Sequence, residues 1–261
     1  MTSVISLLSG VRRAGRRVAM TAAALVVGAG LAGTAAAQDL GSGWTGQVTP
    51  YVWATGVGGT IRPFTGAPTV RIDKSFSEIL RDLDAAFFIS GFARRDRFVL
   101  LGDLSYSSSS RSGLVGPGIP ASGSLRQTSL TFAGGYRVVA DPGATFDVLA
   151  GARAWDIRAR ADVPLAGISA ARNVSFVDPI IAARTNLQIA PGWSFIAYGD
   201  IGGFGVGSRL TGQVAATLNY QVSDRVWLSG GYRHLRVDYR KGGTRIDMNM
   251  SGPLIGATLR F

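Results

Sequence analysis

The stretch that decides the fold is residues 251–261, which read SGPLIGATLRF. In an extended strand, successive side chains point to opposite faces. One face of this strand is apolar and consists of Ile255, Ala257, Leu259 and Phe261. The opposite face carries Gly256, Thr258 and Arg260. This alternation predicts a strand with lipid on one side and a polar interior on the other, although a soluble sheet also produces it.

The other end of the chain has the features of an export signal. Arg12, Arg13, Arg16 and Arg17 precede an apolar run over residues 18–33, and Ala35-Ala36-Ala37 follows. Basic, apolar and small residues in this order predict a secretory signal peptide over 1–37, cleaved before Gln38. The run is also about as long as a short membrane helix, so an uncleaved anchor is the alternative.

Composition places residues 38–261 in the all-β class. Loss of residues 1–37 removes four arginines and no acid, so the net charge falls from +11 to about +7. The chain has 36 glycines, only 10 prolines and no cysteine, which favours strands and turns and excludes disulfides. No second apolar run approaches the length of a spanning helix. The domain is therefore either soluble or crosses a membrane as a β-barrel.

Turn signals distinguish these two architectures. Short turns are predicted at 95–96, 141–143, 191–192 and 223–224, and longer connections at 58–84, 110–124, 162–173, 205–209 and 240–244. Short turns on one rim and long loops on the other are typical of outer-membrane barrels, where the short turns are periplasmic. The predicted strands are 44–57, 86–94, 97–109, 124–139, 145–161, 173–189, 193–204, 210–222, 225–239 and 245–261. We therefore predict a closed antiparallel transmembrane β-barrel of ten strands, with eight or twelve as alternatives and both termini on the periplasmic rim.

Strand parity predicts which charges face the interior. In 173–189, for example, Val177 and Ile181 alternate with Asp178 and Arg184, whereas 86–94 does not indicate its faces. Segments 151–160 and 231–240 are similar, and their common phase places Trp155 and Leu235 inside. The predicted lumen charge network consists of Asp103, Asp147, Asp178, Asp200, Arg137, Arg153, Arg184, Arg233 and Arg260. Near-balanced charge in a narrow barrel predicts a hydrogen-bonded, ion-paired plug, and a narrow or gated conduit is the alternative.

One segment breaks the strand rhythm. Over 75–84, Ser75 and Glu78 have the spacing of a capping box. The face formed by Phe76, Ile79, Leu80 and Leu83 has helical periodicity. A short amphipathic helix is predicted in the first long loop, either packed over or into the barrel mouth or lying on its outer rim.

Four segments carry a family resemblance, namely 44–56, 76–84, 230–233 and 250–254. They resemble a group of proteobacterial outer-membrane β-barrel proteins, mostly without assigned function. The general architecture is similar to that of small OmpA-like or opacity-like barrels. The resemblance implies an outer-membrane location and brings no catalytic residues. It also implies that Ile255, Ala257, Leu259 and Phe261 form a C-terminal signal read by the barrel assembly machinery.

The remaining predictions concern partners and chemistry. Outer loops rich in arginine predict contact with outer-membrane lipid and with lipopolysaccharide phosphates, whereas a merely solvated rim is the alternative. No nucleic-acid-binding module is present, and a monomer is expected. The single histidine, His234, has Ser229 and Asp238 nearby in sequence, but the spacing matches no catalytic pattern. We expect no enzyme, metal or cofactor, and a structural or envelope-interaction role, with a narrow porin-like channel or a lipid-modifying enzyme as alternatives.

Overall fold

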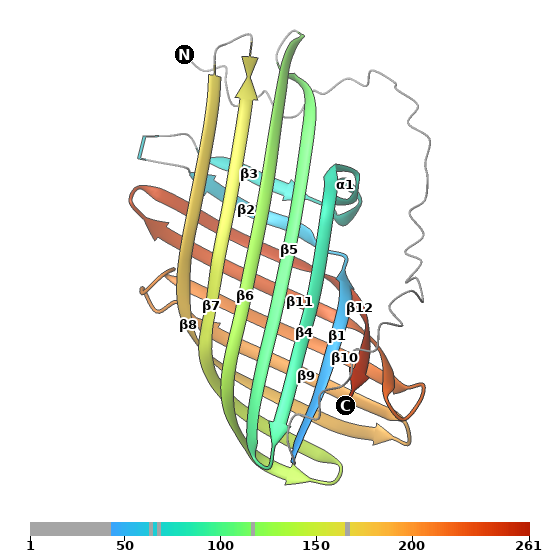
Figure 1. Ribbon diagram of the computed structural model, residues 1–261. Helices are drawn as coiled ribbons and strands as arrows, with labels where there is room; N and C mark the ends of the chain where they lie inside the picture. The colour runs from blue at the N-terminus through green and yellow to red at the C-terminus, as the bar shows by residue number, and fades with distance from the viewer. Residues whose placement is uncertain (1–42, 63–64, 67–68, 116–117, 165–167) are drawn as a thin grey trace.

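The computed structural model describes residues 43–62, 65–66, 69–115, 118–164 and 168–261 (Figure 1). The predicted signal peptide, 1–37, lies outside the described residues. The elements are β1 Trp44–Trp53, β2 Gly56–Arg62, β3 Val70–Lys74, α1 Phe76–Asp82, β4 Leu83–Arg95, β5 Phe98–Val115, β6 Ile119–Asp141, β7 Ala144–Val163, β8 Ile168–Ala190, β9 Trp193–Gly202, β10 Leu210–Gln221, β11 Val226–Lys241 and β12 Thr244–Arg260. Within the described residues, no helix is both long enough and apolar enough to cross a membrane.

The strands form a closed antiparallel barrel. Ten of them make the ring, in the order β1, β4 through β12, and the pairing of β1 with β12 closes it. Gly46 and Phe261 exchange backbone hydrogen bonds of 2.8 and 2.9 Å where the ring closes. The predicted ten-stranded barrel is thus confirmed. β2 pairs with the first half of β12, and β3 pairs with β2, so these two strands extend the sheet outside the ring.

The two rims of the barrel differ. The lower rim is formed by the turns at 96–97, 142–143, 191–192 and 222–225. At the opposite, upper rim, β5 to β8 rise above the rest of the ring, and β2, β3 and α1 lie at the same end (Figure 1). β1 begins and β12 ends at the lower rim, as the even strand number predicts.

Several predicted loops are wrong. The segments 110–124 and 162–173 are mostly strand, because β5 pairs with β6, and β7 with β8, almost to their tips. The segment 58–84 contains β2 and β3 as well as the helix, and the predicted strand 44–57 is interrupted at 54–55. The segments 110–124 and 162–173 are rich in glycine, serine, alanine and proline, so no continuous apolar row marks them as strands.

The polarity of the barrel wall inverts along its height. In the lower half of β12, Ile255 and Leu259 point outward and are more than half exposed, whereas Thr258 is buried inside. In the upper half, Met248 and Met250 are buried inside, and Arg245 and Asn249 are exposed outside. The same inversion occurs in β7 and β11, above Ala154 and Tyr232 respectively. The lower part therefore has an apolar exterior and an interior in which the buried charges lie beside an apolar cluster of Val99, Ala133, Leu149, Ile180 and Ala182. The upper part has a polar exterior and a mainly apolar interior, like a soluble protein.

The apolar exterior forms a band around the lower barrel. It spans residues 146–154 in β7 and 253–261 in β12, which matches the roughly 9 to 11 residues that a tilted strand needs to cross a bilayer. Aromatic side chains gather where the band meets the lower rim. Phe98 packs edge-on against Tyr136 at 5.8 Å, and Trp193 lies 4.8 Å from Tyr220. Such a girdle is typical of the interfacial zone of membrane barrels.

Candidate functional site in the barrel interior

The lowest interior layer is built from arginines. Asp147, which is fully buried, accepts hydrogen bonds from Arg137 at 2.7 and 3.2 Å and from Arg184 at 3.4 Å. The Arg184 guanidinium also lies 4.2 Å from the centre of the Phe92 ring. One carboxylate thus serves two guanidinium groups.

The middle layer contains two ion pairs, each of which joins strands that are not neighbours in the ring. Arg153 donates to both carboxylate oxygens of Asp200, at 3.0 and 2.6 Å, and to Thr131 at 2.9 Å. Neither side chain of the Arg153–Asp200 pair is exposed. Pairing and additional hydrogen bonds are the conditions under which buried charges are tolerated.

The second pair joins Arg233 to Asp103 at 3.0 Å. Tyr51 donates to Asp103 at 2.8 Å and also contacts Arg233, while Gln213 accepts from Arg233 at 2.6 Å. The sequence predictions did not include Tyr51 among the interior residues. The alternation in 44–57 indicates the inward position of Tyr51, because Tyr51 shares a face with the polar residues Gln47 and Thr49.

Above these ion pairs lies an apolar layer. Its buried members are Trp53, Phe88, Trp155, Ile157, Val174, Leu235, Val237, Tyr239, Ile246, Met248, Met250 and Leu254. Trp155 and Leu235 are inside, as their predicted phase required, with 2% and 0% exposure. Near the top of this layer, Arg172 reaches from β8 to donate to Thr244 of β12 at 2.7 Å.

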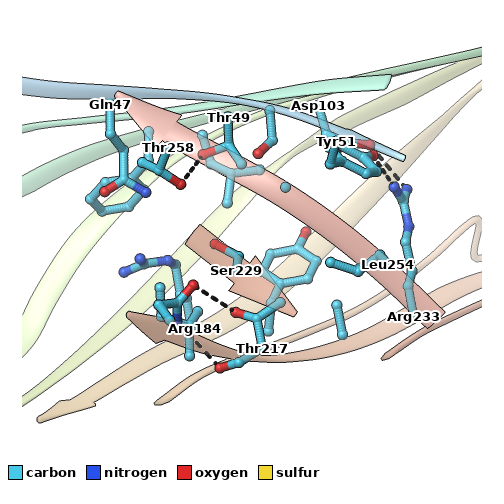
Figure 2. Close-up of a pocket in the computed structure, with 18 of the residues that line it drawn as sticks. Gln47, Thr49, Tyr51, Asp103, Arg184, Thr217, Ser229, Arg233, Leu254 and Thr258 are labelled. Atoms are coloured by element: carbon cyan, nitrogen blue, oxygen red, sulfur yellow. Dashed lines mark hydrogen bonds and ion pairs between the residues drawn. The ribbon is translucent and has the colours of Figure 1, made fainter. Parts of the chain in front are cut away.

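Three cavities remain between and around the layers. A central cavity of about 150 Å³ lies between Arg184 and Arg233, which Figure 2 shows on opposite sides of it. A lower vestibule of about 670 Å³ shares Gln47, Phe92 and Arg184 with the central cavity. An upper cavity of about 470 Å³ lies beside the apolar layer and beneath α1. Among the described residues, the upper and central cavities share no lining residue.

Helix α1 covers the upper cavity rather than the outer wall. Phe76, Ile79 and Leu83 line this cavity together with Met248 and Met250 of β12. The helix begins at a capping box in which Glu78 accepts hydrogen bonds from the Ser75 amide at 2.9 Å and its hydroxyl at 2.8 Å. These bonds hold the pKa of the Glu78 carboxyl below its usual range.

One predicted member of the helix face lies elsewhere. Leu80 is 54% exposed and does not line the cavity. Asp82 binds Lys74 at 2.9 Å and Arg111 at 3.5 Å, and these ion pairs fix the roll of a helix of only seven residues. With that roll, the row from Phe76 through Ile79 to Leu83 faces inward and Leu80 faces away.

Two charges of the predicted network are inside but not ion-paired. Asp178 accepts hydrogen bonds from the Ser208 amide at 2.6 Å and its hydroxyl at 2.7 Å, so it holds the β9–β10 loop. The Arg260 guanidinium lies 4.0 Å from the Trp227 ring centre, and its buried Nε has no hydrogen-bond partner among the described residues. These two inward charges are therefore held by a loop and by an aromatic ring rather than by an ion pair among the described residues.

A cluster of arginines lies outside the barrel, just above the apolar band. Arg126 of β6 stands directly opposite Arg158 of β7, and both are exposed. Asp156 binds Arg158 at 2.8 Å, and Ser175 donates to Asp156 at 2.8 Å. The Ser175 hydroxyl, followed by Arg158, holds the pKa of the Asp156 carboxyl below its usual range. We refer to Arg126 and Arg158 as the outer arginine cluster.

The candidate catalytic residues do not meet. His234 faces outward and lies 2.5 Å from the Ser251 hydroxyl, whereas Ser229 lines the central cavity inside. Asp238 is engaged by Arg209 at 3.6 Å and Arg240 at 2.8 Å. Within the described residues, no group of three or more histidine, cysteine or acidic side chains could hold a metal ion.

Comparison with known proteins supports the fold assignment. No protein-family model and no curated protein matches the chain. The outer membrane protease OmpT from Escherichia coli is a similar solved structure, with 11% identity, a TM-score of 0.51, and coverage of 84% of this chain and 96% of that one. The attachment invasion locus protein Ail of Yersinia pestis has 12% identity and a TM-score of 0.39, with coverage of 84% of this chain and 99% of that one. The translocator domain of the autotransporter NalP from Neisseria meningitidis has 16% identity and a TM-score of 0.45, with coverage of 85% of this chain and 89% of that one.

These findings define the class of the protein by its architecture. The closed ten-stranded ring and the likeness to OmpT are those of an outer-membrane β-barrel protein. A likeness at 11% identity shows the fold alone, so it assigns no activity to this chain.

Proposed function

We propose that the protein is an integral outer-membrane barrel with a closed lumen, and that its role is structural or interactive at the cell surface. In this proposal the lower rim faces the periplasm and the upper barrel projects beyond the outer leaflet. A cleaved signal peptide over 1–37 would export the chain, and the outward row ending at Phe261 would be its assembly signal. The apolar band supports the membrane location, because a soluble monomer rarely exposes apolar surface of that extent.

The observation that carries the proposal is the filling of the interior at two levels. The middle layer closes the barrel with Arg153–Asp200 and Arg233–Asp103, and the apolar layer closes it again above. The central and upper cavities share no lining residue among those described. An aqueous path would have to pass both levels, which favours a packed interior over a narrow porin-like channel.

Conductance in planar bilayers tests this closure. The folded wild-type protein is expected to give no discrete conductance steps. A variant that removes side chains from both levels, such as R233A combined with W155A, is the positive control and should conduct. Steps of uniform size from the wild type, altered by exchange of Arg184 or Asp178, would instead establish a channel.

We further propose that the outer arginine cluster binds phosphate groups of lipopolysaccharide. Arg126 and Arg158 are like charges placed directly opposite each other, which is destabilising, and the single carboxylate of Asp156 beside them leaves an excess of one positive charge. The cluster stands four residues above Leu130, an exposed side chain of the apolar band, and hence about 13 Å along the strand from it. Headgroup phosphates are expected at that height, and guanidinium groups bind them well.

Vesicle binding tests this second part. Replacement of both Arg126 and Arg158 by glutamine should weaken binding of lipopolysaccharide by about 30-fold, since each basic side chain near an anionic surface contributes about 1 kcal/mol. The exchange R97Q, in a lower-rim turn, is the matched control and should have no effect. Equal binding of intact and dephosphorylated lipopolysaccharide by the wild type would contradict the proposal.

A further inference from the structure

The lower vestibule concentrates positive charge. Five arginines line it, namely Arg94, Arg137, Arg184, Arg225 and Arg260. Two acids accompany them: Asp224, which also lines the vestibule, and the buried Asp147 behind Arg137 and Arg184. Even if the carboxylate of Phe261 is counted as a third acid, an excess of two positive charges remains.

The partners of these arginines leave donors free. Arg137 and Arg184 share the single carboxylate of Asp147. Arg260 stacks on Trp227 at 4.0 Å, an arrangement that positions the guanidinium without supplying a negative charge. Its Nε is buried and, within the part of the chain that the structure describes, lacks a hydrogen-bond partner. A buried, unpaired donor on a cation costs free energy that a bound anion would recover.

The shape of the vestibule suits a small ligand. Its volume of about 670 Å³ lies within the range of roughly 300 to 1,000 Å³ for ligand pockets. Trp44, Phe92 and Phe261 provide apolar wall between the arginines. The vestibule also lies at the same end of the barrel as the aromatic girdle of Tyr136 and Trp193, where headgroups of the inner leaflet would stand.

We propose that the lower vestibule is an anion-binding site for a phosphate-bearing ligand. Planar guanidinium groups donate two parallel hydrogen bonds to phosphate oxygens, and several of them neutralise a multiply charged group. The phosphate belongs either to a soluble molecule that enters from the periplasm or to the headgroup of an inner-leaflet phospholipid. In both cases Arg260 and Arg225 contact the anion, and Arg184 lies at the inner end of the site.

Calorimetric titration of the full chain, folded in a neutral detergent, tests this site. The probes are pyrophosphate, inorganic phosphate and mixed micelles containing phosphatidylglycerol, each against chloride at equal ionic strength. R260Q should raise the dissociation constant of the binding probe about tenfold, the usual effect of losing one charge-assisted hydrogen bond. R225Q, in an exposed turn, should raise the dissociation constant by a similar factor. This second variant keeps the test valid if R260Q does not fold. R209Q, in the β9–β10 loop at the opposite end, is the control.

The outcomes either identify the source of the phosphate or overturn the proposal. Binding of pyrophosphate or phosphate identifies a soluble ligand, and binding of phosphatidylglycerol alone identifies a lipid headgroup. Absence of binding by all three probes beyond the chloride reference would overturn the proposal. Binding that R260Q and R225Q leave unchanged, or that R209Q weakens equally, would place the anion elsewhere and overturn it as well.

Discussion

The buried pair of Arg153 and Asp200 should dominate the stability of the middle layer. The exchange D200N keeps the shape of the side chain but leaves the Arg153 guanidinium, which has 0% exposure, without its counter-charge. Removing one partner of a buried pair costs about 3–5 kcal/mol, because the remaining charge stays buried and uncompensated. The hydrogen bonds from Arg153 to Thr131 at 2.9 Å and to Thr211 at 3.3 Å reduce this cost but do not supply the missing negative charge.

A surface pair of similar geometry is the matched control. Arg158 and Asp156 are 2.8 Å apart, close to the 2.6 Å of the buried pair, but Arg158 is 57% exposed. D156N should therefore cost only about 0–1 kcal/mol. The double exchange R153M/D200L should recover most of the loss caused by D200N, since apolar residues of similar volume replace buried ion pairs well.

Urea unfolding in detergent micelles, followed by tryptophan fluorescence, measures these differences. D200N should lose clearly more unfolding free energy than D156N, and the double variant should lose less than D200N. If D200N were no more destabilising than D156N, the interior would be hydrated at this level. The description of a packed middle layer would then be wrong.

Three further predictions concern single contacts. Acidification should destabilise α1, because the hydrogen bonds from Ser75 hold the pKa of Glu78 below its usual range. The contribution of this cap to helix stability is complete above the ordinary glutamate pKa, and it is lost as the pH falls through the depressed pKa. Amide exchange in α1 should show this, and E78Q should abolish the pH dependence. G231A should impair folding, measured by heat-modifiability on gels, because a Cβ there would lie 2.0 Å from a backbone oxygen of β10, and unchanged folding would contradict the register. D178A should cost about 2–4 kcal/mol through the two lost bonds to Ser208, and an unfolding midpoint equal to that of the wild type would refute its role.

The sequence predicted the lower barrel because lipid imposes a strict rule there. Ile255 and Leu259 must face outward, so Thr258 and Arg260 must face inward, and the same argument holds for Arg153 in β7. The upper barrel follows a different rule. There Met248 and Met250 face inward although they are apolar. The predicted strand 245–261 still covered this half of β12, but the upper ends of β5 to β8, at 110–124 and 162–173, carry no lipid-facing row and were predicted as loops.

The partners inside the barrel were not predictable from alternation. Parity places Arg233 and Asp103 inside, but they lie 130 positions apart and on strands that are not neighbours in the ring. Which charges meet depends on strand tilt and stagger, which are properties of the closed ring. Likewise, alternation did not predict that Asp178 binds Ser208 of the β9–β10 loop or that Arg260 stacks on Trp227.

The central claim is that hydrocarbon surrounds the lower barrel and that charges are hidden within it. The chain has no cysteine, so single cysteines for spin labels can be introduced freely. Labels at Ile181 and Ala183, which point outward on β8, should be accessible to oxygen dissolved in the bilayer and protected from a water-soluble nickel reagent. A label at Ala182, between them, should be accessible to neither, because its side chain points into the packed interior. Equal accessibility of all three positions to the nickel reagent would contradict the account.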